Sequence, residues 1–137
     1  MGENVVLVAA SNPVILKAVY NRLMSKKLNV HDISSVEDVI RMAKSLTRLD
    51  FLVIDFSLSS STVTDGFELA EKVLSIRSDV RGIVIMSYMS EIRLVSLTCD
   101  RNRPFTIAAH RPNFCKNGAL LMSFADEVTR MVLAMAC

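Results

Sequence analysis

The chain has 137 residues, of which 51% are hydrophobic and 22% charged; this balance is typical of a globular domain and excludes a disordered chain. Its 16 basic and 14 acidic residues are interspersed and leave a net charge of +2, so we expect no nucleic-acid partner. No apolar run approaches the ~20 residues of a membrane span, and no signal peptide opens the chain. We therefore expect one domain over residues 1–137, with no membrane association.

The cysteines and histidines do not form a pattern that binds metal or builds disulfides. Cys99, Cys115 and Cys137 share no close spacing, and an odd, scattered set favours neither a disulfide framework nor a zinc site. His31 and His110 have no second ligand at metal spacing, so we expect surface or edge-strand positions for them. With no signal peptide, these features predict a cytoplasmic protein.

Five short runs of the sequence are rich in β-branched and apolar residues. They are Val5–Ala9, Asn29–Ile33, Phe51–Ile54, Ile83–Met86 and Phe105–Ala109. Longer stretches with helical periodicity separate them, which is typical of parallel strands joined by helices. The first, third and fourth runs are almost entirely apolar, whereas the second alternates and the fifth is mixed, which indicates edge strands. The sequence thus predicts an α/β three-layer sandwich, a five-stranded parallel sheet in the flavodoxin-like order 2-1-3-4-5.

The helices between these runs carry start signals. The expected starts are Asn12-Pro13, Ser35 with Asp38, a capping box of Asp65 with Glu68, Ser90 for a short fourth helix through Leu97, and about Asn117 for a last helix that runs to Ala136.

The last helix is unusually apolar. One face carries Leu121, Phe124, Ala125, Val128, Val132 and Met135, with Met122 and Leu133 at its edge. A wide core face is one interpretation, with methionine as a flexible filler. A partner surface or homodimer interface on the fourth and fifth helices is the other.

Polar residues close several of the predicted strands. Ligands of open parallel sheets bind beyond the carboxyl ends of the strands, where the strand order reverses. The residues at these ends are Ala10 and Ser11 after the first strand, Asp55 after the third, Ser87 after the fourth, and His110, Arg111 and Pro112 after the fifth. A carboxylate, a hydroxyl and a guanidinium are therefore expected to converge at one edge.

These positions carry a family resemblance. Asp55, the segment Asp65-Gly66-Phe67-Glu68-Leu69, Ser87 and the basic Arg111 before Pro112 together resemble the receiver domain of two-component response regulators, in order and spacing over nearly the whole chain. The resemblance implies that Asp55 accepts a phosphoryl group from a histidine kinase, and that Ser87 and Arg111 contact its oxygens. It also implies a cis peptide bond before Pro112, and two acidic residues that hold Mg²⁺ with Asp55.

The chain departs from that pattern in several places. Ala10 and Ser11 occupy the positions of the acidic pair, and Mg²⁺ requires oxygen ligands that they do not supply as carboxylates. Arg111 replaces a lysine, Ala108 replaces the aromatic switch residue, and the loop between Asp55 and Asp65 is longer than usual. We therefore expect no metal and no cofactor, with Asp55 either paired with Arg111 or capping a helix.

The function expected from these features is that of an atypical receiver domain, not an enzyme, which signals through contacts with a protein partner such as a histidine kinase or a downstream signalling protein. The alternative is a working phosphoacceptor, with Asp55 phosphorylated and Mg²⁺ bound. A nucleotide- or flavin-binding domain ranks last, because no glycine-rich loop follows the first strand.

Overall fold

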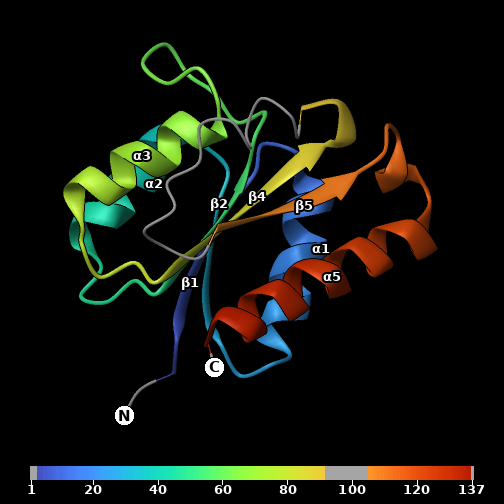
Figure 1. Ribbon diagram of the computed structural model, residues 1–137, viewed down its shortest axis with the longest axis horizontal. Coiled ribbons are helices and arrows are strands. Elements are labelled where there is room, and N and C mark those ends of the chain that lie inside the picture. The colour runs from blue at the N-terminus through green and yellow to red at the C-terminus, as the bar shows by residue number, and fades with distance from the viewer. Residues whose placement is uncertain (1–2, 92–104, 137) are drawn as a thin grey trace.

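The sheet has the predicted topology. The computed structural model describes residues 3–91 and 105–136, and it contains a five-stranded parallel sheet in the order β2-β1-β3-β4-β5 (Figure 1). The strands are β1 Val5–Ala9, β2 Asn29–Ile33, β3 Phe51–Asp55, β4 Gly82–Tyr88 and β5 Phe105–His110. The mixed polarity of the second and fifth runs thus correctly identified the edge strands. Three strands extend further than predicted, so that Asp55, Ser87 and His110 lie inside β3, β4 and β5.

Four α-helices and two 3₁₀ turns surround the sheet in the described part of the chain. They are α1 Pro13–Met24, α2 Val36–Ser45, α3 Gly66–Ile76, α5 Gly118–Ala136, η1 Met89–Glu91 and η2 Phe114–Lys116. Ser90 and Glu91 lie within η1, and the rest of the predicted fourth helix falls outside the described residues. The proposed dimer interface on the fourth and fifth helices therefore remains a prediction.

The helix starts follow the predicted capping residues. The side-chain oxygen of Asn12 accepts from the backbone N–H of Val14, and that of Ser35 accepts from Asp38. Asp65 caps α3 through Glu68 N at 2.8 Å. The reciprocal half of the predicted capping box is wrong, because the Glu68 carboxylate accepts from the Thr64 hydroxyl at 2.6 Å instead. These bonds satisfy N–H groups that have no partner inside a helix.

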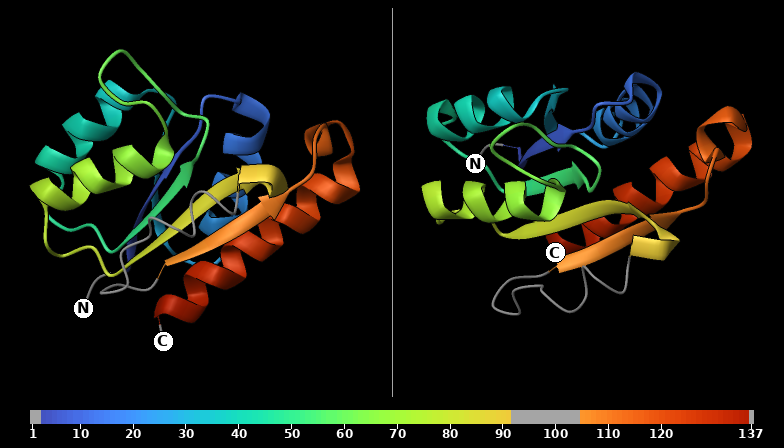
Figure 2. Two further views of the ribbon diagram at one scale, coloured as in Figure 1. Left: turned by 45° about the horizontal axis from the view of Figure 1, so that its top comes forward. Right: turned by 90° about the horizontal axis from the view of Figure 1, so that it is seen from above.

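The sheet lies between two helical layers, as Figure 2 shows. Side chains alternate along each strand, so Val6 and Val8 pack with α1 and α5, while Leu7 and Ala9 pack with α2 and α3. Every residue of β1 and β3 is buried. This burial confirms the three-layer sandwich and explains why these two runs are continuously apolar.

Most of the apolar face of α5 belongs to the core. Its buried residues are Phe124, Ala125, Val128, Thr129 and Val132, which include four of the predicted six. Leu120 and Met122, at the amino-terminal end of the helix, are 53% and 50% exposed. The core interpretation thus holds for the centre of the helix, and its exposed end remains a candidate contact surface. No helix of the described segments is long and apolar enough to span a membrane.

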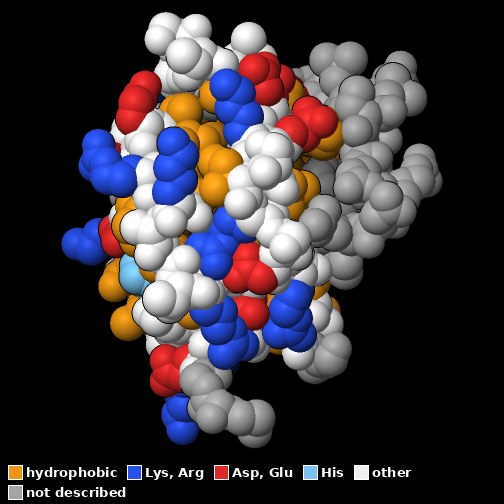
Figure 3. All heavy atoms as spheres, turned by 90° about the vertical axis from the view of Figure 1, so that its left-hand side faces the viewer, with side chains coloured by type: hydrophobic (Ala, Val, Ile, Leu, Met, Phe, Trp, Pro, Cys, Tyr) orange, Lys and Arg blue, Asp and Glu red, His pale blue; other side chains and the backbone are white. Residues whose placement is uncertain are grey.

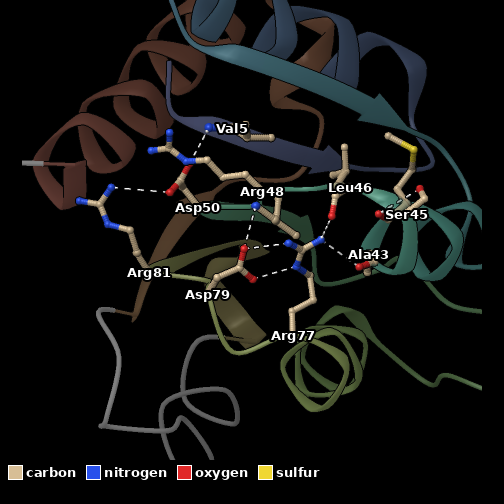
Figure 4. Close-up of polar contacts among 11 residues, drawn as sticks. Val5, Ala43, Ser45, Leu46, Arg48, Asp50, Arg77, Asp79 and Arg81 are labelled. Atoms are coloured by element: carbon tan, nitrogen blue, oxygen red, sulfur yellow. Dashed lines mark hydrogen bonds and ion pairs between the residues drawn. The ribbon is translucent and has the colours of Figure 1, made fainter. Parts of the chain in front are cut away.

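Paired charges hold together the amino-terminal edge of the sheet (Figure 4). Asp50 is 4% exposed, and its carboxylate accepts from Val5 N at 2.8 Å and from Arg48 Nε at 2.7 Å. Nearby, Arg77 pairs with Asp79 at 2.8 Å and donates to the carbonyl of Leu46 at the end of α2. On the molecular face of Figure 3, basic and acidic side chains are interspersed, as the sequence suggested.

Candidate functional site

The predicted site residues lie at the carboxyl edge of the sheet, but they do not all converge. Asp55 ends β3 opposite Met86, and Ser87 lies next to it on β4. Ala10 follows β1 and is fully buried, whereas Ser11 is exposed. Asp55 and Ser87 are therefore brought to adjacent strands, and the position of the acidic pair is filled by a methyl group and a short hydroxyl.

Asp55 is held by its own loop. The residue is 6% exposed, and Oδ1 accepts from the backbone N–H of Ser57 at 3.1 Å and from the Ser57 hydroxyl at 3.0 Å. These bonds to a serine two residues ahead form a local turn that fixes the carboxylate. Asp55 is thus neither a helix cap nor a partner of Arg111.

Gly66 allows α3 to start directly against the end of β3. A Cβ atom at this position would lie 2.3 Å from the carbonyl oxygen of Asp55 and 2.9 Å from the Cγ2 atom of Ile54. The Gly66 N–H donates to the carbonyl of Phe56 at 2.8 Å, which ties the helix start to the same turn. Gly66 has no positive φ, so the glycine is required for space and not for backbone freedom. The Asp-Gly pair at 65–66 therefore positions the Asp55 backbone.

Ser87 forms a hydrogen bond to the carboxylate of Glu91, a residue that was not predicted to belong to the site. Ser87 is 1% exposed, and Oγ donates to Oε2 of Glu91 at 2.8 Å. The backbone N–H of Tyr88 donates to the same oxygen at 3.1 Å. Glu91 comes from η1, which folds back over the end of β4. An acidic residue four positions after a serine at a strand end is the signal that could have suggested this contact.

Arg111 and Pro112 do not take the predicted places. Arg111 is exposed, and within residues 3–91 and 105–136 no ion pair joins it to Asp55, so the expected pairing is wrong. The cis peptide bond expected before Pro112 is also wrong, since that bond is trans. The chain instead turns at Asn113, which has a left-handed conformation with φ 60° and leads into η2. This turn supplies the change of direction without a cis bond.

His110 lies in the edge strand β5, which is one of its two predicted positions, and it is buried there. It is 8% exposed and stacks on Phe114 with ring centroids 4.3 Å apart, while Tyr88 and Phe124 contact it edge-on at 4.6 and 5.3 Å. Its Nδ1 atom has no hydrogen-bond partner in the part of the chain that the structure describes. Burial lowers the pKa of His110, and the charge of Asp55, the nearby backbone of Arg111 and the charge of Glu91 oppose this shift. The imidazole is thus influenced by both carboxylates of the site.

Ala108 is fully buried in β5 and contributes to the core on the α1 and α5 side. No aromatic side chain is present at this position, and the rings gather around His110 instead.

The donor set at this edge does not fit a magnesium ion. Mg²⁺ requires near-octahedral oxygen coordination, usually with one or two carboxylates. Of the three carboxylates that the resemblance implies, Asp55 alone is present, since Ala10 contributes no side-chain oxygen and Ser11 contributes a hydroxyl; Asp55 Oδ1 also accepts two hydrogen bonds from Ser57. No cluster of three potential ligands among His, Cys, Asp and Glu occurs in the described segments.

Comparison with known proteins gives structural matches only. The chain matches no protein-family model and no curated protein sequence. A response regulator receiver protein from Sinorhizobium medicae WSM419 superposes with a TM-score of 0.65 at 20% identity, over 93% of this chain and 95% of that one. The Salmonella typhimurium RcsB response regulator superposes with a TM-score of 0.71 at 14% identity, over 99% of this chain and 61% of that one.

An adenylate cyclase structure from Rhodopirellula baltica superposes with a TM-score of 0.68 at 12% identity, over 98% of both chains. Identities this low establish the fold alone. The chain has the five-stranded, flavodoxin-like fold of response-regulator receiver domains.

Proposed function

We propose that this chain is an atypical receiver domain that works in two-component signalling in the cytoplasm without Mg²⁺-dependent phosphorylation of Asp55. The observation that carries this proposal is the edge beside Asp55, where the fully buried Ala10 and the exposed Ser11 occupy the positions of the acidic pair. Phosphoryl transfer depends on neutralising charge that spreads over the phosphoryl oxygens. The proposal is supported by two features of the described segments: no carboxylate stands at Ala10 or Ser11, and no ion pair joins the Arg111 guanidinium to Asp55.

Signalling would then proceed through protein contacts and not through chemistry, so we do not assign an enzymatic activity. The partner is a histidine kinase or a downstream signalling protein. The exposed Leu120 and Met122 on α5 offer apolar contact area for such a partner or for a second copy of the chain. Charges of both signs are mixed along the chain, which favours a protein partner over nucleic acid.

A working phosphoacceptor is the second candidate function. It is favoured by one feature of the geometry, which is that Asp55 and the buried Ser87 hydroxyl lie at the ends of adjacent strands.

Intact mass spectrometry after incubation with acetyl phosphate separates the two candidates. The wild type and Asp55→Asn are incubated with and without Mg²⁺, and a receiver domain of known activity shows that the conditions label an ordinary site. We expect no phosphoryl adduct on this chain. A Mg²⁺-dependent adduct on the wild type that is absent from Asp55→Asn would establish the phosphoacceptor instead.

A further inference from the structure

We propose that Glu91 is a built-in anion, which occupies the two hydrogen-bond donors that would otherwise bind an external oxyanion at this edge of the sheet. The inference deepens the proposed function and rests on it, because it gives a reason why a phosphoryl donor finds no vacant site beside Asp55. The ligand class that would compete with Glu91 is a tetrahedral oxyanion, of which inorganic phosphate is the simplest.

The donor pair is built into the end of β4. Ser87 Oγ at 2.8 Å and Tyr88 N at 3.1 Å both donate to Oε2 of Glu91. Two N–H or O–H groups that converge on one ionised oxygen make charge-assisted hydrogen bonds, which are stronger than neutral ones. Ser87 Oγ also lies 3.2 Å from the carbonyl of Tyr88, but a hydroxyl has one proton, and the carboxylate is the closer acceptor. The structure thus shows this pair binding an anion.

The bound carboxylate lies beside the phosphoacceptor position. Asp55 and Ser87 are at the ends of adjacent strands, and Tyr88 is paired with His110 across β4 and β5. Asp55 and Glu91 both act on the imidazole of His110, which is consistent with their closeness. An incoming oxyanion would therefore meet two negative charges while the donors are already used, and both effects oppose its binding.

The contact arises from short-range chain geometry. Glu91 follows Ser87 by four residues, and η1 turns the chain so that its side chain returns to the strand end. Because the anion belongs to the same chain, its effective concentration at the donors is high and a free oxyanion must displace it. Removing the Glu91 carboxylate should therefore open the donor pair without moving Asp55, which is held separately by Ser57.

The test is a titration of the full chain with inorganic phosphate at constant ionic strength, in which the ¹⁵N–¹H signal of Tyr88 is followed by NMR. The variants are Glu91→Ala and Glu91→Gln. The control is Glu71→Gln, which removes an exposed carboxylate on α3. We expect Glu91→Ala to bind phosphate with at least a tenfold lower Kd than the wild type, and the control to bind as the wild type does.

A second measurement needs no ligand. Glu91→Gln replaces the ionised acceptor by a neutral one, so the signal of the Tyr88 amide proton should shift upfield. The chemical shift of this proton should be unchanged in Glu71→Gln. The inference is overturned if the chemical shift of the Tyr88 amide proton is the same in Glu91→Gln as in the wild type, or if phosphate binds Glu91→Ala no more tightly than the wild type. The proposed function fails on a different result, the Mg²⁺-dependent adduct on wild-type Asp55, so the two failures are distinguishable.

Discussion

Replacing Gly66 by alanine tests whether the start of α3 is positioned by lack of space. The added Cβ would lie 2.3 Å from the Asp55 carbonyl oxygen, about 1 Å inside ordinary van der Waals contact, and 2.9 Å from the Asp55 carbonyl carbon. Both are backbone atoms of a central strand and cannot rotate away. Overpacking costs about 1–3 kcal/mol, and we expect the upper value here. Alanine's better helix propensity returns about 1 kcal/mol, which leaves a net loss of about 2 kcal/mol.

The other glycines of the described segments provide the controls. A Cβ on Gly118 meets nothing within 4 Å, so Gly118→Ala should be neutral or stabilising by up to about 1 kcal/mol. A Cβ on Gly82 would meet Met135 Sδ at 2.3 Å, but a flexible methionine side chain can move, so its loss should be smaller than at Gly66. Urea unfolding followed by circular dichroism gives all three free energies. A Gly66→Ala variant as stable as Gly118→Ala would refute the argument.

Two pH-dependent effects should also be measurable. The hydrogen bond from Arg77 holds the pKa of Asp79 at about 2, below 3.8, so its contribution is present above about pH 4 and disappears as the pH falls through about 2. The Asp79 side chain is 44% exposed, so we expect solvent screening to limit its contribution to the free energy of unfolding to about 1 kcal/mol. The Asp79→Asn variant should be less stable than the wild type by this amount at pH 5 and equally stable at pH 2. A stability difference that does not change with pH would contradict the assignment. Burial lowers the pKa of His110 below 6.5, so the unfolded chain takes up protons first and stability should fall as the pH drops below 6.5. His110→Phe, which also removes the unpartnered Nδ1, should be at least as stable as the wild type at pH 7.5, and its advantage in free energy of unfolding should be larger at pH 5.5. The same stability difference at both pH values would show that His110 does not titrate this way.

The fold could be predicted from the sequence because its signals are local and repeated. Continuous apolar runs at Val5–Ala9 and Phe51–Ile54 identify strands covered on both faces, and the polar His31 and Asp32 identify an edge. Asn12, Ser35 and Asp65 each cap a helix as predicted. Each of these signals depends on a few neighbouring residues, and all of them indicate the same topology.

The site was only partly predictable, because strand-end position does not determine side-chain direction. Asp55 and Ser87 are held within β3 and β4, so their places followed from the sheet order. Arg111 lies beyond β5, where the left-handed Asn113 turns the chain, and no periodicity in the sequence predicts that turn. The contact of Glu91 depends on a 3₁₀ turn of three residues, which is shorter than any pattern that sequence periodicity can detect.

Buried polar groups have different kinds of partners at the two edges of the sheet. At the amino-terminal edge, the buried carboxylate of Asp50 has arginine partners and a backbone donor, which is how a buried charge is tolerated for stability. At the carboxyl edge, Asp55 and Glu91 accept from hydroxyl and amide groups within residues 3–91 and 105–136, and over the same residues His110 has a buried nitrogen without a partner. A buried carboxylate without an arginine partner in the described segments and an unsatisfied ring nitrogen both lower stability, so their concentration at one edge argues that this edge is kept for recognition and not for folding.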